Sequence, residues 1–215
     1  MIDGPRLPPA SGAKPRSLVV FLHGYGADGN DLIGIGREWA PKLPHTAFVS
    51  PNAPQLCAGA GIGRQWFALT MRDPHEFARG VAAARPGLDE FLDAELARHG
   101  LEESAMALVG FSQGTMLALH IGPHRRSRVA GILGYSGLLA DPKALAADTV
   151  HKPPVMLIHG ERDDLIPVAA IFSAAQGLAA AEIPVEWHIS PGIPHGIGPD
   201  GMEIGLSFLK RVLPR

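Results

Sequence analysis

The sequence predicts an α/β fold with a mostly parallel central sheet and helices on both faces. Two observations support this: short continuous apolar runs recur along the 215 residues, and helical patterns separate them. A run without polar alternation is typical of a strand that is covered on both faces. Strands that alternate with helices usually pair in parallel, because each helix crosses over one face of the sheet.

The elements can be assigned in chain order. The predicted strands are the apolar runs at residues 17–22, 47–49, 106–109, 129–133, 155–158 and 185–189. Apolar residues at helical spacing predict helices around 88–96, 168–178 and 202–213. Pro167 and Pro199 lie near the first turns of the last two, where proline is tolerated. Pro86 is expected to end or kink the helix that precedes it.

The remaining segments indicate how the chain is organised. Residues 1–16 are rich in Pro and Gly and are expected to form at most an edge strand. Residues 52–72, with three closely spaced glycines, are interpreted as an irregular excursion near the site. We find no repeat or linker, and this length suits one large domain. The prediction is a single α/β domain over residues 1–215.

Composition excludes several classes of protein. The chain is 46% hydrophobic and 19% charged with a net charge of −2, which gives no electrostatic reason to bind nucleic acid. The densest basic run, residues 125–128, is interpreted as a solvated loop. No apolar run approaches the roughly 18 residues that span a bilayer.

Cysteine content and the N-terminus bear on location. The single cysteine, Cys57, excludes an intramolecular disulfide and has no companion for a metal site. The first residues lack the layout of a signal peptide. We therefore expect a cytoplasmic protein that needs neither a metal nor a cofactor, as a monomer or a homodimer.

A G-x-S-x-G motif, GFSQG at 110–114, lies between a predicted strand and a predicted helix. In that context the motif is typical of a nucleophilic serine on a sharp turn. The turn is too tight for side chains at its ends, which explains the two glycines. It would place the Ser112 hydroxyl at the carboxyl end of the sheet and direct the Gln113 amide into the same space.

A serine nucleophile needs a base and a third group that orients the base. In α/β-hydrolases the acid and then the histidine follow the serine, each after a strand. Here an acid-rich segment, 159–164, follows one strand, and a Pro/Gly-rich segment containing His195 follows the next. His195 is therefore the predicted base, whereas the nearby His159 is better explained as a structural hydrogen-bonding residue.

Spacing leaves some assignments open. Glu161, Asp163 and Asp164 all remain candidates for the acid. Ser136, in a Gly-Tyr-Ser-Gly segment at the end of a predicted strand, is a minor alternative to Ser112.

Stabilisation of an oxyanion requires preorganised N–H donors. One predicted donor is the Gln113 amide. The second normally comes from the loop after an earlier strand. Here that loop is LHGYG at 22–26, where flanking glycines would let the Tyr25 amide turn inward.

The same loop offers a rival interpretation. Gly24, Gly26 and Gly29 form a G-x-G-x-x-G pattern after a strand, as in NAD(P)-binding oxidoreductases. Such an enzyme needs an acid about 20 residues on, after the next strand, and residues 47–51 contain none. A hydrolase fold that serves only as a binding module would be expected to lack a triad member, and none is missing.

Several segments together resemble the phospholipase/carboxylesterase family of small α/β-hydrolases, which includes acyl-protein thioesterases. They are FLHGYG at 21–26, SPNAP at 50–54, GFSQG at 110–114, HGERDDLIP at 159–167 and PHG at 194–196. The resemblance implies a metal-independent serine esterase with Ser112, Asp163 and His195 as its triad. It implies oxyanion amides at Tyr25 and Gln113, and it identifies Asp163 as the acid.

The chain departs from the family pattern at Thr115, Ala68 and Asp164, which puts substrate preference in doubt rather than the chemistry. Short carboxylic esters are the expected substrates, and thioesters or lysophospholipids are the alternative. The predicted substrate-binding residues are Trp66, Phe67, Leu165 and Ile166. For each of them, an ordinary core position is the competing interpretation.

Overall fold

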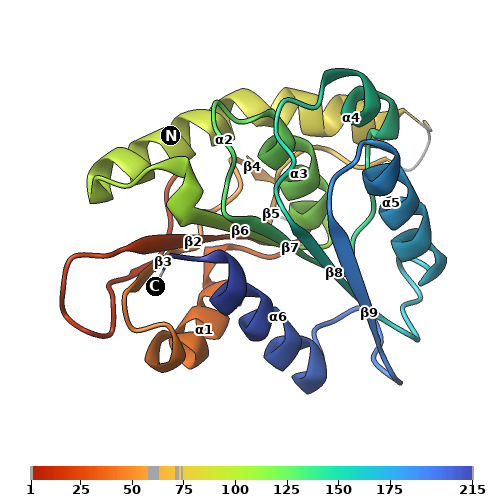
Figure 1. Cartoon of the computed structure of the whole chain (residues 1–215). Coiled ribbons are helices and arrows are strands. Elements are labelled where there is room, and N and C mark those ends of the chain that lie inside the picture. The colour runs from red at the N-terminus through yellow and green to blue at the C-terminus, as the bar shows by residue number, and fades with distance from the viewer. Residues whose placement is uncertain (1, 58–62, 71–72, 74, 215) are drawn as a thin grey trace.

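A computed structural model describes residues 2–57, 63–70, 73 and 75–214. A seven-stranded sheet in the order β1-β3-β2-β6-β7-β8-β9 runs through the centre (Figure 1). Its strands are β1 (Arg6–Leu7), β2 (Ser17–Leu22), β3 (Thr46–Val49), β6 (Met106–Phe111), β7 (Gly131–Tyr135), β8 (Val155–Gly160) and β9 (Val185–Ser190). β1 pairs antiparallel with β3, and the other neighbouring pairs are parallel.

Helices cover both faces of this sheet, which confirms the predicted fold class. The elements outside the main sheet are α1 (Gly29–Trp39), η1 (Ala40–Lys42), β4 (Gln55–Leu56), β5 (Arg64–Gln65), α2 (Glu76–His99), η2 (Glu103–Ala105), α3 (Gln113–Ile121), η3 (Gly122–His124), α4 (Pro142–Asp148), α5 (Ala169–Ala180) and α6 (Pro199–Val212). Helices α1 and α6 lie on one face, and α2, α3 and α5 lie on the other (Figure 1). Among the described residues, no helix is long and apolar enough to cross a membrane.

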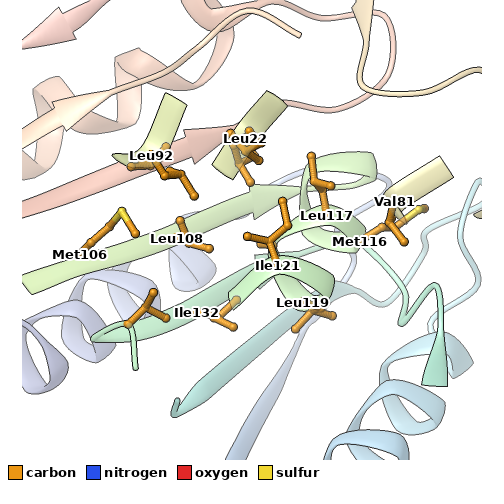
Figure 2. Packing of buried hydrophobic residues seen from close by; sticks show 14 of the residues in the cluster. Leu22, Val81, Leu92, Met106, Leu108, Met116, Leu117, Leu119, Ile121 and Ile132 are labelled. Carbon is orange, nitrogen blue, oxygen red and sulfur yellow. The ribbon is translucent and has the colours of Figure 1, made fainter. Parts of the chain in front are cut away.

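The central strands read as continuous apolar runs because both of their faces are covered. In β2, Leu18, Val20 and Leu22 belong to the core on the α2/α3 face. Val19 and Phe21 of the same strand belong to the core on the α1/α6 face. Figure 2 shows strand residues packing against helix residues on the α2/α3 face. Each fully buried aliphatic side chain contributes roughly 1.5–3 kcal/mol.

Two strands differ from the expectation. β7 begins at Gly131 rather than at residue 129, and it extends to Tyr135. β9 is an edge strand, and its Trp187 is 50% exposed, packed edge-on against Phe172 of α5. Here the apolar run correctly predicted a strand, but that strand is not buried on both faces.

Of the two expectations for Pro86, that it ends or kinks the preceding helix, the first is wrong, because α2 continues through it to His99. Proline removes one helical N–H, so the carbonyl four residues earlier, at Ala82, loses its partner. Both Pro86 and Ala82 are exposed, so water can satisfy that carbonyl. The buried stripe of α2, which includes Val81, Leu88 and Leu92, runs along the helix on both sides of Pro86.

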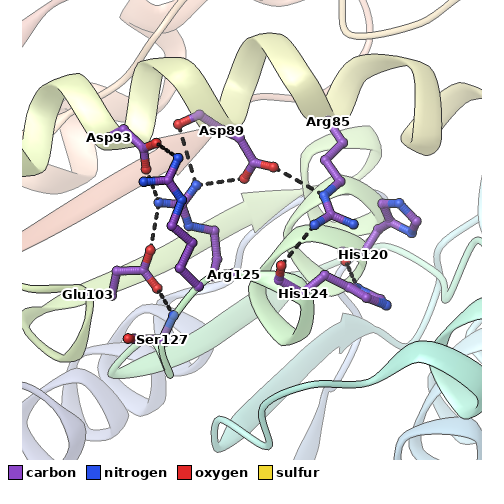
Figure 3. A network of polar contacts seen from close by, with 9 residues as sticks. Arg85, Asp89, Asp93, Glu103, His120, His124, Arg125 and Ser127 are labelled. Carbon is purple, nitrogen blue, oxygen red and sulfur yellow. Dashed lines mark hydrogen bonds and ion pairs between the residues drawn. The ribbon is translucent and has the colours of Figure 1, made fainter.

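The interpretation of residues 125–128 as a solvated loop is wrong for Arg125, whose side chain is 2% exposed. Its guanidinium donates to Asp89 Oδ1 at 2.7 Å, to Glu103 Oε1 at 2.8 Å and to Asp93 (Figure 3). Glu103 also accepts from the Ser127 N–H at 2.6 Å. These five residues, here called the Arg125 cluster, join α2 to the segments that precede β6 and β7.

Candidate active site

The G-x-S-x-G motif forms a sharp turn between β6 and α3. Ser112 has φ of 52° and ψ of −114°, a region that L residues rarely occupy. A Cβ at Gly110 would lie 2.5 Å from the Gly114 backbone, and one at Gly114 would lie 1.8 Å from the Leu22 carbonyl oxygen. Both glycines are therefore required by close backbone contact.

The end of β7 holds this turn. The Ser112 N–H donates to the Tyr135 carbonyl at 2.9 Å. Thr115, one of the departures from the family pattern, is buried and donates its hydroxyl to the same carbonyl at 2.8 Å. A Cβ at Gly134 or Gly137 would overlap the Thr115 side chain, so glycine at these two positions leaves room for Thr115.

Asp163 follows β8, and its side chain is fully buried. Its Oδ1 accepts the backbone N–H groups of Leu165 at 3.0 Å and Ile166 at 2.8 Å. Its Oδ2 lies 2.7 Å from Nδ1 of His195. Glu161 and Asp164, the other candidate acids, are exposed. The structure therefore brings Asp163, and neither of its competitors, against His195.

The contact with Asp163 fixes the protonation pattern of the His195 ring. A carboxylate only accepts, so Nδ1 carries the hydrogen and Nε2 of a neutral ring is left as an acceptor. The ring also packs on Phe111, with centroids 5.0 Å apart, which places it beside the residue that precedes Ser112.

The Ser112 and His195 loops meet at consecutive residues of one strand end. Tyr135 accepts from the Ser112 N–H, and Ser136 donates its hydroxyl to the Gly196 carbonyl at 3.2 Å. Both Ser112 and His195 are within the described residues, and no hydrogen bond joins the Ser112 hydroxyl to the imidazole. Ser136 is 1% exposed, so its geometry fits a support for the histidine loop.

A second histidine contacts Asp163. The His159 side chain is 2% exposed, and its Nε2 lies 2.8 Å from the Ile166 carbonyl and 3.2 Å from Asp163 Oδ2. Both neighbours are acceptors, so Nε2 must carry a hydrogen. His159 therefore ties the two ends of the Asp163 turn together, in line with the structural interpretation of this residue.

The loop after β2 lies against the serine turn. A Cβ at Gly24 would lie 3.3 Å from Ser112 Cβ, so the two loops are in contact. The Gly26 N–H donates to the Arg64 carbonyl, and the Arg64 N–H donates to the Ala27 carbonyl, both at 2.9 Å. Within the described part of the chain, no acceptor is paired with the Tyr25 N–H.

The excursion is hydrogen-bonded to this loop. The Trp66 indole N–H donates to the His23 carbonyl at 2.9 Å. The buried His23 ring donates from Nδ1 to the Gly24 carbonyl at 2.8 Å, and its Nε2 accepts the Ala53 N–H at 3.0 Å. Burial lowers the pKa of His23, which keeps the ring neutral in this arrangement. Sequence reasoning missed this role, although a histidine that ends an apolar run was the available signal.

Gln113 connects the serine turn to the excursion through its side chain. It is fully buried. Its Oε1 accepts the Trp66 N–H at 2.8 Å, and its Nε2 donates to the Phe67 carbonyl at 2.8 Å. As the first residue of α3, its own N–H has no intrahelical acceptor.

The four predicted substrate-binding residues are not gathered around one cavity. Trp66 and Phe67 are 1% and 4% exposed, and they line a cavity of about 720 Å³ between the N-terminal segment and α2. Leu165 is 71% exposed beside Asp163, and Ile166 is half-buried against the core. Neither Leu165 nor Ile166 lines the cavity behind Trp66.

The glycine pattern of the rival interpretation has a packing explanation. A Cβ at Gly29 would lie 2.1 Å from the Ser50 carbonyl oxygen, so glycine is needed where α1 meets the end of β3. Asp28 caps α1 by accepting the Asn30 N–H at 2.7 Å. Among the residues that the structure describes, no three His, Cys, Asp or Glu side chains gather as a metal site.

Comparisons with known proteins point in one direction. A model of the family described as Phospholipase/Carboxylesterase matches residues 9–213. The chain is 27% identical to acyl-protein thioesterase 1 of Gibberella zeae, covering 92% of this chain and 91% of that protein. It is 29% identical to esterase YpfH of Escherichia coli, covering 94% and 86%. The crystal structure of esterase PE8 superposes with a TM-score of 0.94 at 42% identity, covering 99% of both chains.

Proposed function

Since the chain belongs to the phospholipase/carboxylesterase family of carboxylic ester hydrolases, we propose that it cleaves short carboxylic esters through an acyl-enzyme on Ser112. The observation that carries this proposal is the buried Asp163 carboxylate bonded to Nδ1 of His195, beside a serine in a sharp turn. That arrangement leaves Nε2 of His195 as the acceptor for a hydroxyl proton.

In the first half-reaction, Ser112 Oγ attacks the ester carbonyl while His195 Nε2 takes the hydroxyl proton. Negative charge develops on the carbonyl oxygen, and the Tyr25 and Gln113 amides donate to it. Losing one such donor typically costs about 10²–10³ in rate. His195 then gives its proton to the departing alcohol.

In the second half-reaction, His195 removes a proton from water, which attacks the acyl-enzyme and regenerates Ser112. Asp163 keeps the imidazole in the Nδ1–H tautomer and stabilises the imidazolium without taking the proton. The Asp163 carboxylate accepts from the N–H groups of Leu165, Ile166 and His195.

Thioesters are the alternative substrate class, because the same steps expel a thiol. The names of the relatives include both classes, acyl-protein thioesterases and esterases. We further propose that the chain acts as one domain in the cytoplasm, where the buried Cys57 stays reduced. We propose it does so as a monomer or homodimer on a small ester or thioester.

A fluorophosphonate probe tests the nucleophile directly. It phosphonylates an activated serine, so intact-protein mass should rise by one adduct, and peptide mapping should place that adduct on Ser112. Ser112→Ala should abolish both the adduct and the hydrolysis of p-nitrophenyl butyrate. Ser136→Ala is the matched control and should still react. An adduct that persists in Ser112→Ala would refute the assignment.

A further inference from the structure

A groove of about 690 Å³ is lined mainly by residues of α1 and α6. These two helices lie on the face of the sheet opposite α2 and α3 (Figure 1). Its lining is largely apolar. Leu32 and Trp39 of α1 and Leu206 of α6 are buried, and Ile35 and Met202 are half-buried along it. Both helices begin at the carboxyl edge of the sheet, and the groove lining includes Phe111 and Gly196, the sequence neighbours of Ser112 and His195.

The groove is continuous with the His195 loop. Phe111 lines it and also packs its ring 5.0 Å from the His195 ring. Gly196 lines it as well, and its carbonyl is fixed by the Ser136 hydroxyl. A molecule held at this end of the groove would therefore be adjacent to the imidazole rather than to the loop of Tyr25.

The rim of the groove is acidic. Asp31 and Glu38 of α1 and Glu203 of α6 line it and are exposed, and Lys42 is the one basic residue among its lining residues. Within the described ranges, none of these four side chains forms an ion pair. Three carboxylates and one ammonium leave a net charge of −2 beside an apolar surface, which favours a cation that carries an apolar body.

We propose that this groove binds the alcohol portion of the substrate and selects cationic, apolar leaving groups. The inference rests on the proposed function, in which His195 protonates the leaving oxygen, so the leaving group extends from the oxygen nearest to that ring. The Phe111 and Gly196 end of the groove receives its first atoms. The apolar lining then contacts its chain, and the rim carboxylates attract its charge.

The test compares esters that share one acyl group and differ in the alcohol. Acetate esters of ω-trimethylammonio-alkanols with two to eight methylenes are paired with their uncharged tert-butyl isosteres and with ω-sulfonato-alkyl esters. We expect kcat/KM to favour the cation over its neutral isostere by about three- to tenfold at the best chain length, since exposed charge pairs are individually weak. The anion should be the poorest substrate, and 1 M NaCl should reduce the difference.

Variants locate the effect. Glu203→Gln combined with Asp31→Asn should remove most of the preference for the cation over its neutral isostere. Asp148→Asn, which removes an exposed carboxylate on α4, is the matched control and should leave the preference unchanged. Met202→Trp should narrow the groove and lower kcat/KM for the longer alcohols only.

The outcomes separate the two proposals. If no ester is hydrolysed, the proposed function fails. If the esters are hydrolysed at rates that do not depend on the charge of the alcohol, the proposed function stands and the groove assignment is overturned. Sensitivity of Met202→Trp to acyl length instead of alcohol length would also overturn it, because it would place the acyl chain in the groove.

Discussion

The Arg125 cluster and the surroundings of Asp163 each bury one charged side chain, and they do so in opposite ways. Arg125 lies near the amino ends of β6 and β7 and meets three carboxylates (Figure 3). Asp163 lies at the carboxyl end of β8 and accepts from three N–H donors, two from the backbone and one from His195, while His159 Nε2 lies 3.2 Å from its Oδ2. The first site pairs its buried charge with opposite charges, whereas the second pairs its buried carboxylate with N–H groups.

We therefore expect the Arg125 cluster to contribute chiefly to stability and Asp163 chiefly to the reaction rate. Removing one partner of a buried ion-pair network leaves an uncompensated charge and lowers stability. Removing the Asp163 charge leaves a neutral side chain in a polar cavity and should chiefly lower the rate. Mutations at the two sites should therefore separate stability from activity.

The largest effect is expected for Asp163→Asn. The amide would present an N–H where His195 needs an acceptor, so the ring would adopt the wrong tautomer, and kcat should fall by about 10⁴. The free energy of unfolding should change far less than for a change at Arg125. Stopped-flow hydrolysis of p-nitrophenyl butyrate and urea titration measure the two quantities. A decrease in kcat of less than tenfold would contradict the proposed difference between the two sites.

Arg125→Met should show the reverse pattern. It leaves Asp89, Asp93 and Glu103 without their shared cation, so the free energy of unfolding should drop by about 3–5 kcal/mol. The kcat of the folded fraction should stay unchanged. Arg126→Met is the matched control, because Arg126 is 84% exposed and should change stability by about 0.5 kcal/mol or less. Equal losses in both variants would contradict the assigned role of burial.

His159→Met should have a smaller effect on rate. It removes the Nε2–H that donates to the Ile166 carbonyl beside Asp163, so the Asp163 turn loses one hydrogen bond and we expect kcat to fall by about tenfold or less with little change in KM.

The matched variant is His159→Gln, whose amide nitrogen lies near the position of Nε2. Recovery of kcat in His159→Gln would indicate that the donor matters. If both variants lose stability but keep kcat, His159 only stabilises the Asp163 turn.

The smallest expected effect concerns His120, which lies beside the Arg125 cluster (Figure 3). Burial, together with His124 and Arg85, lowers the pKa of His120 to about 4. Below pH 6.5 the unfolded chain binds a proton that the folded chain does not, so stability should fall with acidification. The ring is partly exposed, so we expect a loss of only about 1 kcal/mol between pH 7 and 5. In urea titrations, His120→Gln should lose less stability over this interval.

The sequence was sufficient to predict the fold class, because apolar runs and helical stripes are local patterns. The sequence also predicted that the loops of Ser112, Asp163 and His195 would meet, since parallel strands end at one edge of the sheet, and the structure brings these loops together. Burial of Arg125 could not be foreseen, because its three carboxylates come from α2 and η2, and a basic run is locally identical whether or not acids cover it. The continuation of α2 through Pro86 depended on exposure of Ala82.

The position of Trp66 illustrates a second limit. An aromatic residue near a candidate site suggests a substrate contact, yet its indole N–H is used by the His23 carbonyl and its own N–H by Gln113. Such tertiary hydrogen bonds leave no trace in the spacing of residues. The assignments of Ser112, Asp163, His195, Tyr25 and Gln113 stay predictions that the experiments above test.

The bridge from the Gln113 side chain to Trp66 and Phe67 limits how new specificities can be engineered. A library that remodels residues 66 and 67 would also shift the residue whose amide is proposed to stabilise the oxyanion, so gains in selectivity would be offset by slower turnover. Randomising Ala68 and Leu69, which lie just beyond the bridge, keeps that anchor intact. Directed evolution of this enzyme should therefore begin downstream of Phe67.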